Sequence, residues 1–561
     1  MRKICFPLLF TLIATISHAQ TTYRLPLDVP PLLSANFGEL RNNHFHTGVD
    51  FKTYGVGKDV FAVADGFVSR VKIAPGGYGL ALYINHPNGH TTVYAHLESY
   101  SKRIEEYIKQ KQYALESFEI DVSLKQGEIT VQKGELIALS GNSGSSGGAH
   151  LHFEIRDTKT EDPVDVLNFL DSYIRDTQSP TISGIAFYPI GNNGVVNGKT
   201  KPAYLPVNKN KSGSYTDLNL PVYAWGKIGV GVRAFDKMNG TSNIYGVKKV
   251  NFSVDGKLLF HSKIDRFSFA KSRMINSFID FSMWQNNRSF YMKSFVERGN
   301  TLPFYKTVNE GYLYINSERD YYCSYQLEDH YGNTTNYSFV IKGKRQTIPD
   351  PPRCENYMSP VANNGYYSSD FMLNIPTGNL YSDLCYTHKS ESSSAFFSDA
   401  VRINDNPIAL IDKAVVWIKL KKHPSKGFSK LGVVKVDTPE NIHWVGGVYK
   451  NDGFEFEVNE LGGQYAIDED TVPPTISVRY PENWTLKKRI SIRLTDDKSG
   501  IGFYKGEIDG RYALFTHDIK SDYYYYDFDD TRLTKNQKHT LKFLAKDKAG
   551  NTDIYSVEFY Y

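Results

Sequence analysis

Three short pieces in the N-terminal part of the chain carry side chains that bind metals or move protons. His46 and Asp50 are separated by three residues, His96 stands alone, and His150 and His152 are separated by one residue. Side chains alternate between the two faces of a strand, so His150 and His152 share one face. In extended chain His46 and Asp50 also share a face. Each pair can therefore present two ligand atoms on one side of a strand.

Two imidazole nitrogens and one carboxylate oxygen can supply three of the four ligands of a tetrahedral zinc site, with water as the fourth. Zinc lowers the pKa of that water to about 7 and polarises a substrate carbonyl. An isolated H-x-H is more often a solvent-facing strand pair, and an isolated H-x-x-x-D is more often a loop with an Asx turn. The presence of both motifs in the segment 46–152, with glycines around each, favours the metal site.

The elements that must position these residues are mostly strands. Between residues 23 and 170, short alternating runs are separated by Asp-Gly, Pro-Asn-Gly and Gly-Gly turns, a pattern typical of antiparallel β structure. The segment 101–117 contains no Gly or Pro, and charged residues flank Ile104, Ile108 and Leu115. This pattern predicts one helix.

This segment resembles the lysostaphin-type (LytM-like) zinc metallopeptidases over roughly residues 35–170. The most specific part of the resemblance is the stretch from Val131 to Arg156. The matching pieces are FGELR at 37–41, HTGVD at 46–50, DGFV at 65–68, GGYG at 76–79, YAHL at 94–97, VQKGELIALSGNSG at 131–144 and HLHFEIR at 150–156.

The resemblance implies one zinc ion in this domain, held by His46, Asp50 and His152. It implies that His150 is the general base or orients the attacking water, and that His96 stabilises the oxyanion or positions the water. No H-E-x-x-H motif occurs, so a glutamate base on a helix is not available. The family cleaves peptide bonds in the stems or cross-bridges of peptidoglycan.

One departure from the family pattern lies at about 98–130, where the connection is longer than usual and contains the predicted helix. We expect this insertion to be a lid that narrows the substrate groove or a docking surface. Tyr78 and the loop 141–148 are expected to line the groove, with a plain hairpin turn as the alternative interpretation of the loop.

The rest of the chain predicts further β domains. A length of 561 residues suggests about four domains. The run DTQSPTIS at 176–183 resembles DTVPPTIS at 470–477, and a D-x-x-G-N turn follows each run, at 329–333 and 547–551. The segment between the second run and its turn, at 470–551, has the size and alternating pattern of an immunoglobulin-like sandwich. Turn formation alone explains the two D-x-x-G-N turns, and calcium binding is the less favoured alternative.

The predicted fold is mainly β: a LytM-like antiparallel β-sheet peptidase domain with a helical insertion, followed by several β-sandwich (Ig-like) domains. The predicted boundaries are a signal peptide at 1–19, the peptidase domain at 20–172, an Ig-like region with an insertion at 173–345, a β-sandwich domain at 346–468 and an Ig-like domain at 469–561.

Composition and the first residues narrow the function classes. The chain has 65 basic and 61 acidic residues, a balance that excludes the strongly basic surface of nucleic-acid-binding proteins. Arg2 and Lys3, an apolar run and Ala19 form a secretory signal peptide, so we expect export to the periplasm or cell envelope. No later segment has 18 uninterrupted apolar residues, and no transmembrane segment is expected after signal removal. The remaining cysteines allow at most one disulfide, whose pairing stays open: Cys323, Cys354 and Cys385.

The leading hypothesis is a secreted zinc-dependent metalloendopeptidase that hydrolyses peptide cross-links or stem peptides of peptidoglycan. One alternative is a non-catalytic LytM-like regulator that activates a cell-wall amidase. Another is an envelope adhesin or glycan-binding protein, and an envelope protein is the expected kind of partner for the Ig-like domains. The presence of all three implied ligands and both auxiliary histidines favours catalysis. The sequence leaves open which peptide bond is cut.

Overall fold

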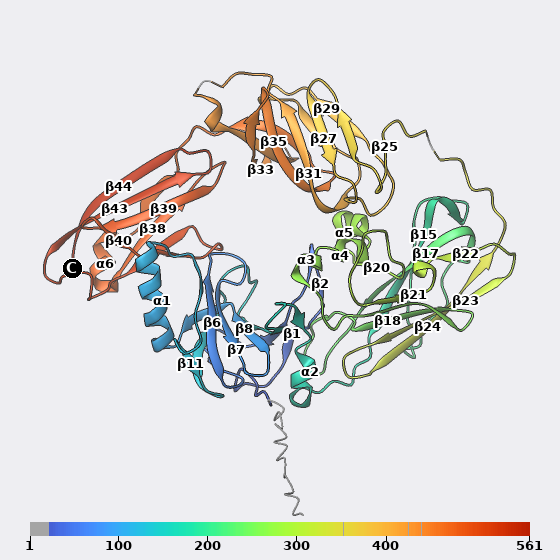
Figure 1. Cartoon of the computed structure of the whole chain (residues 1–561), viewed down its shortest axis with the longest axis horizontal. Helices are drawn as coiled ribbons and strands as arrows, with labels where there is room; N and C mark the ends of the chain where they lie inside the picture. Colours follow the sequence, from blue (N-terminus) through green and yellow to red (C-terminus); the bar gives the residue numbers. More distant parts are fainter. Residues whose placement is uncertain (1–21, 352, 425, 439) are drawn as a thin grey trace, which may run out of the picture.

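The computed structural model describes residues 22–351, 353–424, 426–438 and 440–561. The predicted signal peptide at 1–19 lies outside these residues. Across the described part of the chain, no helix combines the length and apolar character needed to cross a membrane. The protein is built almost entirely from β-sheets arranged as a ring, in which the C-terminal domain returns to the N-terminal one (Figure 1). The structure thus confirms the predicted mainly-β fold; the Ig-like assignment of the later domains stays a prediction.

The N-terminal domain is organised around one nine-stranded antiparallel sheet in the order β1-β4-β13-β8-β7-β6-β10, with β11 beside β6 and β14 beside β13. A three-stranded sheet β5-β12-β9 and a hairpin β2-β3 complete it. Its elements are β1 (Leu33–Ala35), β2 (Leu40–Arg41), β3 (His44–Phe45), β4 (Val49–Lys52), β5 (Asp59–Phe61), β6 (Gly66–Ile73), β7 (Leu80–Asn85), β8 (His90–Ala95), β9 (Leu97–Tyr100), α1 (Lys102–Leu115), β10 (Ile120–Ser123), β11 (Thr130–Val131), β12 (Leu136–Ser140), β13 (His150–Asp157), β14 (Pro163–Val164), α2 (Leu167–Leu170) and η1 (Asp171–Tyr173).

The predicted helical insertion is present as α1. Ile104 and Ile108 are buried as expected, but Leu115 is exposed and Gln112 is buried instead. The Gln112 side-chain amide donates to the carbonyl oxygen of Phe118 at 2.8 Å, which satisfies it inside the fold. The helix ends where Glu116 adopts a left-handed conformation.

The second domain forms a ten-stranded hydrogen-bonded sheet in the order β16-β15-β17-β24-β23-β18-β19-β21, with β20 and β22 paired to β17. All its strand pairs are antiparallel except β17 with β24. Its elements are β15 (Thr181–Val196), β16 (Ala203–Pro206), β17 (Val222–Phe235), β18 (Lys249–Val254), β19 (Lys257–Lys263), α3 (Phe269–Ser272), α4 (Ile275–Phe278), α5 (Phe281–Asn287), β20 (Met292–Lys293), β21 (Tyr305–Thr307), η2 (Asn309–Gly311), β22 (Leu313–Ile315), β23 (Asp320–Glu328) and β24 (Thr334–Gly343).

The third domain contains two five-stranded sheets, β26-β27-β31-β35-β34 and β29-β30-β36-β32-β33, and a small pair β25-β28. Its elements are β25 (Tyr357–Met358), β26 (Asn364–Tyr367), β27 (Phe371–Ile375), β28 (Leu384–Cys385), β29 (His388–Glu391), β30 (Ala400–Ile403), β31 (Ile408–Lys419), η3 (Phe428–Lys430), β32 (Leu431–Thr438), β33 (Asn441–Gly446), β34 (Val448–Lys450), β35 (Gly453–Leu461) and β36 (Gln464–Glu469).

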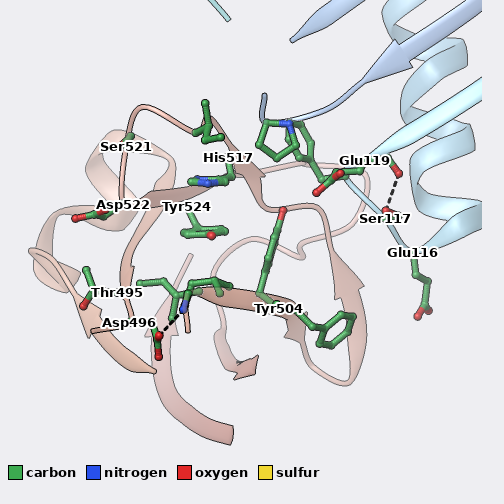
Figure 2. A pocket seen from close by; sticks show the side chains of 18 of the residues that line it. Glu116, Ser117, Glu119, Thr495, Asp496, Tyr504, His517, Ser521, Asp522 and Tyr524 are labelled. Carbon is green, nitrogen blue, oxygen red and sulfur yellow. Dashed lines mark hydrogen bonds between the residues drawn. The ribbon is translucent and has the colours of Figure 1, made fainter. Parts of the chain in front are cut away.

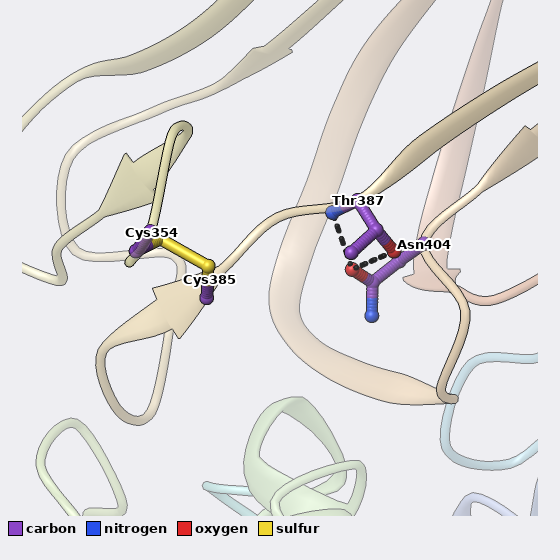
Figure 3. The surroundings of a disulfide bond; sticks show 4 residues. All are labelled: Cys354, Cys385, Thr387 and Asn404. Carbon is purple, nitrogen blue, oxygen red and sulfur yellow. Dashed lines mark hydrogen bonds between the residues drawn. A yellow bond between two sulfur atoms is a disulfide. The ribbon is translucent and has the colours of Figure 1, made fainter. Parts of the chain in front are cut away.

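A disulfide joins Cys354 to Cys385 and ties the entrance of the third domain to β28 (Figure 3). Their Cα atoms lie 5.6 Å apart, within the usual range for a bridge. Cys323, the other cysteine of the described chain, is buried in β23 and unpaired. The structure therefore selects the pair that the sequence left open.

The C-terminal domain contains two four-stranded sheets, β37-β38-β42-β41 and β40-β39-β43-β44. Its elements are β37 (Thr475–Val478), η4 (Pro481–Asn483), α6 (Trp484–Lys487), β38 (Arg489–Thr495), β39 (Ile501–Ile508), β40 (Arg511–Ala513), β41 (Thr516–His517), β42 (Tyr523–Asp527), β43 (Lys538–Asp547) and β44 (Thr552–Tyr560).

The insertion helix α1 is the place where the C-terminal domain closes the ring. Lys109 on α1 pairs with Asp529 at 2.7 Å, and the Arg532 guanidinium stacks 3.8 Å from the ring centre of Tyr113. Just beyond α1, a cavity of about 660 Å³ separates Glu116 and its neighbours from the tyrosines of the C-terminal domain (Figure 2). The insertion thus contacts a domain of its own chain, as the docking alternative expects, and its role as a lid stays a prediction.

Candidate metal centre

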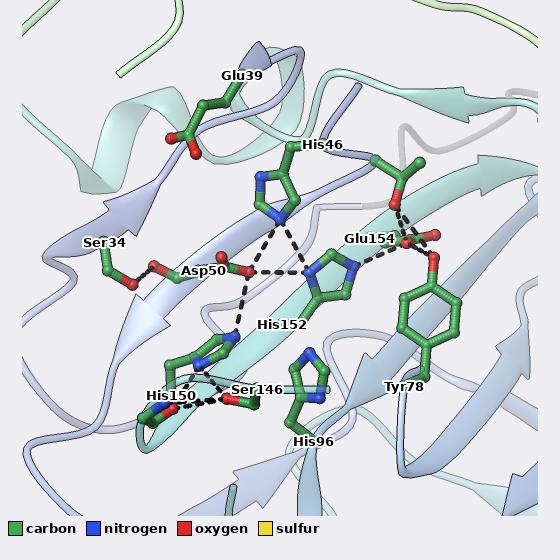
Figure 4. A network of polar contacts seen from close by, with 12 residues as sticks. Ser34, Glu39, His46, Asp50, Tyr78, His96, Ser146, His150, His152 and Glu154 are labelled. Carbon is green, nitrogen blue, oxygen red and sulfur yellow. Dashed lines mark hydrogen bonds and ion pairs between the residues drawn. The ribbon is translucent and has the colours of Figure 1, made fainter. Parts of the chain in front are cut away.

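Strand register places the predicted metal ligands together. In the antiparallel pair β4–β13, His152 lies directly opposite Asp50, and His46 comes just before β4. His46 Nε2 lies 3.0 Å from Asp50 Oδ1 and 3.0 Å from His152 Nδ1, and the last two atoms are 2.8 Å apart (Figure 4). All three side chains are buried. Two nitrogens and one oxygen therefore converge on one point.

The remaining atoms of the three residues are held by other groups. The second ring nitrogen of His46, Nδ1, donates to the carbonyl oxygen of Asn36 at 2.7 Å. His152 Nε2 contacts Glu154 Oε1 at 2.8 Å, and Arg41 donates to Asp50 Oδ2 at 2.9 Å. Partners of this kind fix the orientation and tautomer of metal-binding histidines. Glu154 and Arg41 were not among the predicted site residues, although Glu154 lies two residues after His152 on the same strand face.

Glu154 is the centre of a buried polar network behind His152. It accepts hydrogen bonds from Tyr78 Oη and Thr47 Oγ1, each at 2.5 Å, and from Arg156 Nε at 2.6 Å. Although burial opposes ionisation, Arg156 and His152 hold the pKa of Glu154 far below its usual range. The carboxylate therefore stays charged and keeps His152 in place. The Tyr78 hydroxyl is bonded to Glu154 here, and its place in the lining of the substrate groove stays a prediction.

The electrostatics of the three candidate ligands are coupled. Burial works against the charged form of Asp50, but His46, His150 and His152 hold its pKa well below the usual range. Burial lowers the pKa of His46. For His152, burial is outweighed by hydrogen bonds to Asp50 and Glu154, which raise its pKa to about 9. This set of two imidazoles and one carboxylate fits a zinc ion, which binds these donor types.

His150 and His96 lie beside the cluster and line a cavity of about 340 Å³. His150 Nε2 is 3.5 Å from Asp50 Oδ1, and its Nδ1 donates to the Gly148 carbonyl oxygen at 2.8 Å. His96 Nδ1 donates to the Ser143 carbonyl oxygen at 2.8 Å, and its ring centre lies 4.8 Å from that of His150. The structure thus brings all five sequence-predicted site residues together.

His96 is held in a strained and neutral state. Its φ of 58° lies in the left-handed region, which non-glycine residues rarely adopt outside constrained sites. Burial, with His152 and His150 nearby, lowers its pKa to about 3. Because Nδ1 faces a carbonyl oxygen and carries the proton, Nε2 of the neutral ring keeps a lone pair. His96 therefore presents a hydrogen-bond acceptor, which suits positioning of water better than stabilisation of an oxyanion.

The loop 141–148 forms one wall of the cavity and is fixed from two sides. On the inner side, Gly144 approaches the neighbouring turn so closely that a Cβ atom there would lie 2.3 Å from the nitrogen of Gly79. On the outer side, the Gly144 amide donates to Asp518 Oδ2 at 3.0 Å, and Lys520 Nζ donates to the Asn142 carbonyl oxygen at 2.6 Å. The C-terminal domain therefore holds the loop whose Ser143 carbonyl orients His96.

The second domain supports the opposite side of the centre. Phe45, next to His46, is fully buried, and its ring centre lies 5.3 Å from that of Phe267 and 5.8 Å from that of Phe278. Its backbone amide also donates to Ser272 Oγ at 3.1 Å. The segment that carries the first ligand is therefore packed into the core of another domain.

Comparisons with known proteins give matches for two parts of the chain. The family described as Peptidase family M23 matches residues 44–114, and a Zu5-like domain matches residues 355–470. An uncharacterized metalloprotease from Haemophilus influenzae is 38% identical over 109 residues, which is 19% of this chain and 18% of that protein. The DD-carboxypeptidase/endopeptidase Mpg of Neisseria meningitidis serogroup B is 37% identical over 111 residues, 20% of each chain. The match thus spans about a fifth of the length of these curated relatives.

Solved structures that resemble the N-terminal domain include a zinc-containing peptidase from Vibrio cholerae, with 28% identity, coverage of 26% of this chain and 39% of that one, and a TM-score of 0.20. The catalytic domain of lysostaphin from Staphylococcus simulans has 22% identity, with coverage of 25% and 92% and a TM-score of 0.19. From the sequence matches over the region that contains the first two candidate ligands, we conclude that this chain carries a peptidase family M23 domain of the LytM-like type at its N-terminus, followed by several β-sheet domains.

Proposed function

We propose that this chain is a secreted, zinc-dependent endopeptidase that hydrolyses peptide bonds in the cross-links or stem peptides of peptidoglycan. The observation that carries the proposal is the convergence of His46 Nε2, Asp50 Oδ1 and His152 Nδ1 next to a cavity. The name of the Neisseria relative, DD-carboxypeptidase/endopeptidase, supports the substrate class. The periplasm or cell envelope is the proposed location, and it rests on the predicted signal peptide. A partner protein for the later domains stays a prediction.

Each group around the cavity has a distinct role in this proposal. His46, Asp50 and His152 would hold the zinc ion, which would supply the Lewis acidity for water activation and carbonyl polarisation. His150 donates through Nδ1 to Gly148, so its other ring nitrogen, Nε2, is the base that accepts a proton from the attacking water. His96 offers a lone pair on Nε2 in the same way and orients that water. Glu154 holds the ring of His152 in the orientation for binding.

The test is digestion of purified sacculi by the chain without its signal peptide, with mass spectrometry of the released muropeptides. We expect loss of cross-linked or stem peptides, abolished by 1,10-phenanthroline and by His152→Ala. His44→Ala is the matched control, because His44 is an exposed neighbouring histidine whose Nδ1 bonds only to its local backbone at Asn42. This control should keep full activity.

Two outcomes would contradict the proposal. A zinc-loaded chain that leaves every muropeptide unchanged but stimulates a purified cell-wall amidase would identify a regulator. A chain that binds no zinc under conditions where it is folded would remove the metal centre altogether.

A further inference from the structure

Two clusters of three aspartates occupy corresponding positions in the second and C-terminal domains. In each cluster, one carboxylate oxygen from every member lies within 4.8 Å of the others. The first member precedes the first strand of its domain, the second follows the strand β17 or β38, and the third begins a D-x-x-G-N turn. We call them cluster 1, made of Asp176, Asp236 and Asp329, and cluster 2, made of Asp470, Asp496 and Asp547.

Cluster 1 buries three acidic groups without a counter-ion. The exposed fractions of Asp176, Asp236 and Asp329 are 6%, 4% and 3%. Within the described residues, no lysine, arginine or histidine nitrogen forms an ion pair with any of the six aspartates; Lys498, two residues from Asp496, pairs instead with Asp468. Burial and the neighbouring carboxylates raise the pKa of Asp236 to about 8. Buried charges in proteins are normally paired or bound to metals.

Hydrogen bonds within the fold leave particular oxygens free. Asp176 Oδ1 accepts from the backbone amides of Thr177, Gln178 and Asn239, at 2.8, 3.1 and 3.1 Å. Asp176 Oδ2 is buried and has no partner, and the same is true of Asp236 Oδ1. An unpartnered buried acceptor is costly. These two oxygens therefore need a ligand that the protein itself does not provide.

The D-x-x-G-N turns explain the positions of the first and third members of each cluster but not that of the second. In the second domain, Asn333 Nδ2 donates to Asp329 Oδ2 at 2.6 Å and contacts the backbone oxygen of Asp176 at 3.3 Å. In the C-terminal domain, Asn551 makes the same two contacts, to Asp547 at 2.7 Å and to Asp470 at 3.0 Å. This hydrogen-bonded link positions the first and third members in both domains.

The second member of each cluster lies outside that link. Asp236 Oδ1 has no partner, and Asp496 Oδ1 at the corresponding position is also a buried atom without one, although the Asp496 residue is partly exposed. Turn formation gives no reason for an additional carboxylate at this place, in two domains, where it only adds repulsion. A bound cation gives such a reason.

We propose that cluster 1 and cluster 2 each bind one calcium ion. The donors are all carboxylate oxygens, which hard divalent cations prefer, and calcium tolerates the irregular geometry of loop ligands better than magnesium does. Both sites lie where two domains meet. His330, next to Asp329, contacts Asp165 of the peptidase domain at 3.3 Å. On the other side of the ring, Lys498 of the C-terminal domain donates to the carbonyl oxygen of Glu469, at the end of the third domain, at 2.8 Å.

Calcium at these places fixes two joints of the ring. It neutralises the clustered carboxylates and holds the aspartate that precedes the first strand of each domain against the turn that joins the domain's last two strands. The proposed calcium sites are independent of the zinc centre, because none of the six aspartates is one of the three candidate zinc ligands.

The experiment measures calcium bound per chain by equilibrium dialysis against CaCl₂ and elemental analysis, on the chain without its signal peptide. We expect two ions in the wild type, one in Asp236→Asn, one in Asp496→Asn and none in the double variant. Asp497→Asn and Asp320→Asn are matched controls, because both residues are exposed, close to the clusters in sequence or domain, and outside them. They should keep two ions.

Thermal unfolding provides a second readout that does not depend on counting ions. Calcium should raise the Tm of the wild type, less that of each single variant, and not at all that of the double variant. A folded wild type that binds no calcium, or a double variant that binds as much as the wild type, would overturn the proposal. Asn variants that are more stable than the wild type at every calcium concentration would also overturn it, since they would identify a protonated carboxyl in place of a cation. Equal binding of magnesium would contradict the choice of calcium.

Discussion

The peptidase centre and cluster 1 are both groups of three buried side chains, but they differ in what surrounds them. The His46, Asp50 and His152 group combines nitrogen and oxygen donors and adjoins a cavity with two further histidines. Cluster 1 has only oxygen donors and lies at a joint between domains. The first arrangement has a cavity for a substrate and two histidines that can transfer protons. The second has only carboxylates, which can bind a cation.

The two kinds of group also differ in how the fold positions them. Opposed positions on the paired strands β4 and β13 fix Asp50 and His152, so their separation depends on one hydrogen-bonded register. The aspartates of the clusters come from the ends of strands and from turns, so a bound ion has more influence on their separation. A reactive centre thus has rigid support before it binds its ion, whereas the proposed calcium sites become rigid by binding one.

The largest expected effect comes from removing a ligand of the peptidase centre. His152→Ala should abolish muropeptide release and zinc binding, because it removes one of three donors and exposes a buried partner, Asp50. The calcium-dependent gain in Tm should remain as in the wild type. Zinc content, product release and Tm measured on the same samples check this. If the variant also lost its calcium response, the two kinds of group would be coupled, and the comparison would fail.

A smaller effect is expected from the residue behind that ligand. Glu154→Gln should weaken zinc affinity by about 10- to 100-fold, because Glu154 orients His152 through Nε2. It also leaves Arg156 without its buried carboxylate, so we expect a lower Tm. Competition with a chromogenic zinc chelator measures the affinity. Tyr78→Phe is the milder comparison, since it removes one hydrogen bond to Glu154 and keeps the charge pair; zinc affinity reduced as much as in Glu154→Gln would contradict the assigned role.

The ligands could be predicted from the sequence, but their supports could not. His46, Asp50 and His152 lie in short motifs whose spacing reflects strand geometry, and resemblance to a family linked the motifs. The contact of Asp518 with Gly144 joins residues 374 positions apart, and nothing local marks either one. For the clusters, the D-x-x-G-N turns were visible, whereas Asp236 and Asp496 follow ordinary strands and only the fold brings them to the turns.

Loosening the loop 141–148 tests whether the C-terminal domain contributes to the geometry of the metal centre. Lys520→Ala removes contacts to the carbonyl oxygens of Asn142 and Gly144, and we expect activity to fall by about tenfold or less, because misplacement of His96 disturbs the geometry of attack. Hydrogen exchange of residues 141–148 should increase. Lys535→Ala is the control, since Lys535 pairs with Asp530 within its own domain. Unchanged hydrogen exchange and unchanged activity in Lys520→Ala would mean that the C-terminal domain has no effect on the metal centre.

The smallest effect on catalysis is expected from the calcium clusters. The double variant Asp236→Asn/Asp496→Asn should hydrolyse sacculi at 25 °C at a rate within about threefold of the wild type, because Asp50 and His152 are held by strand pairing and not by the domain joints. Its resistance to heat inactivation should no longer rise with calcium, since calcium protects only a form that binds it. Residual activity after heating, with and without CaCl₂, measures this. A double variant as inactive as His152→Ala, with its zinc retained, would mean that the joints set the geometry of the centre, and the distinction between a rigid centre and a cation-dependent clamp would have to be abandoned.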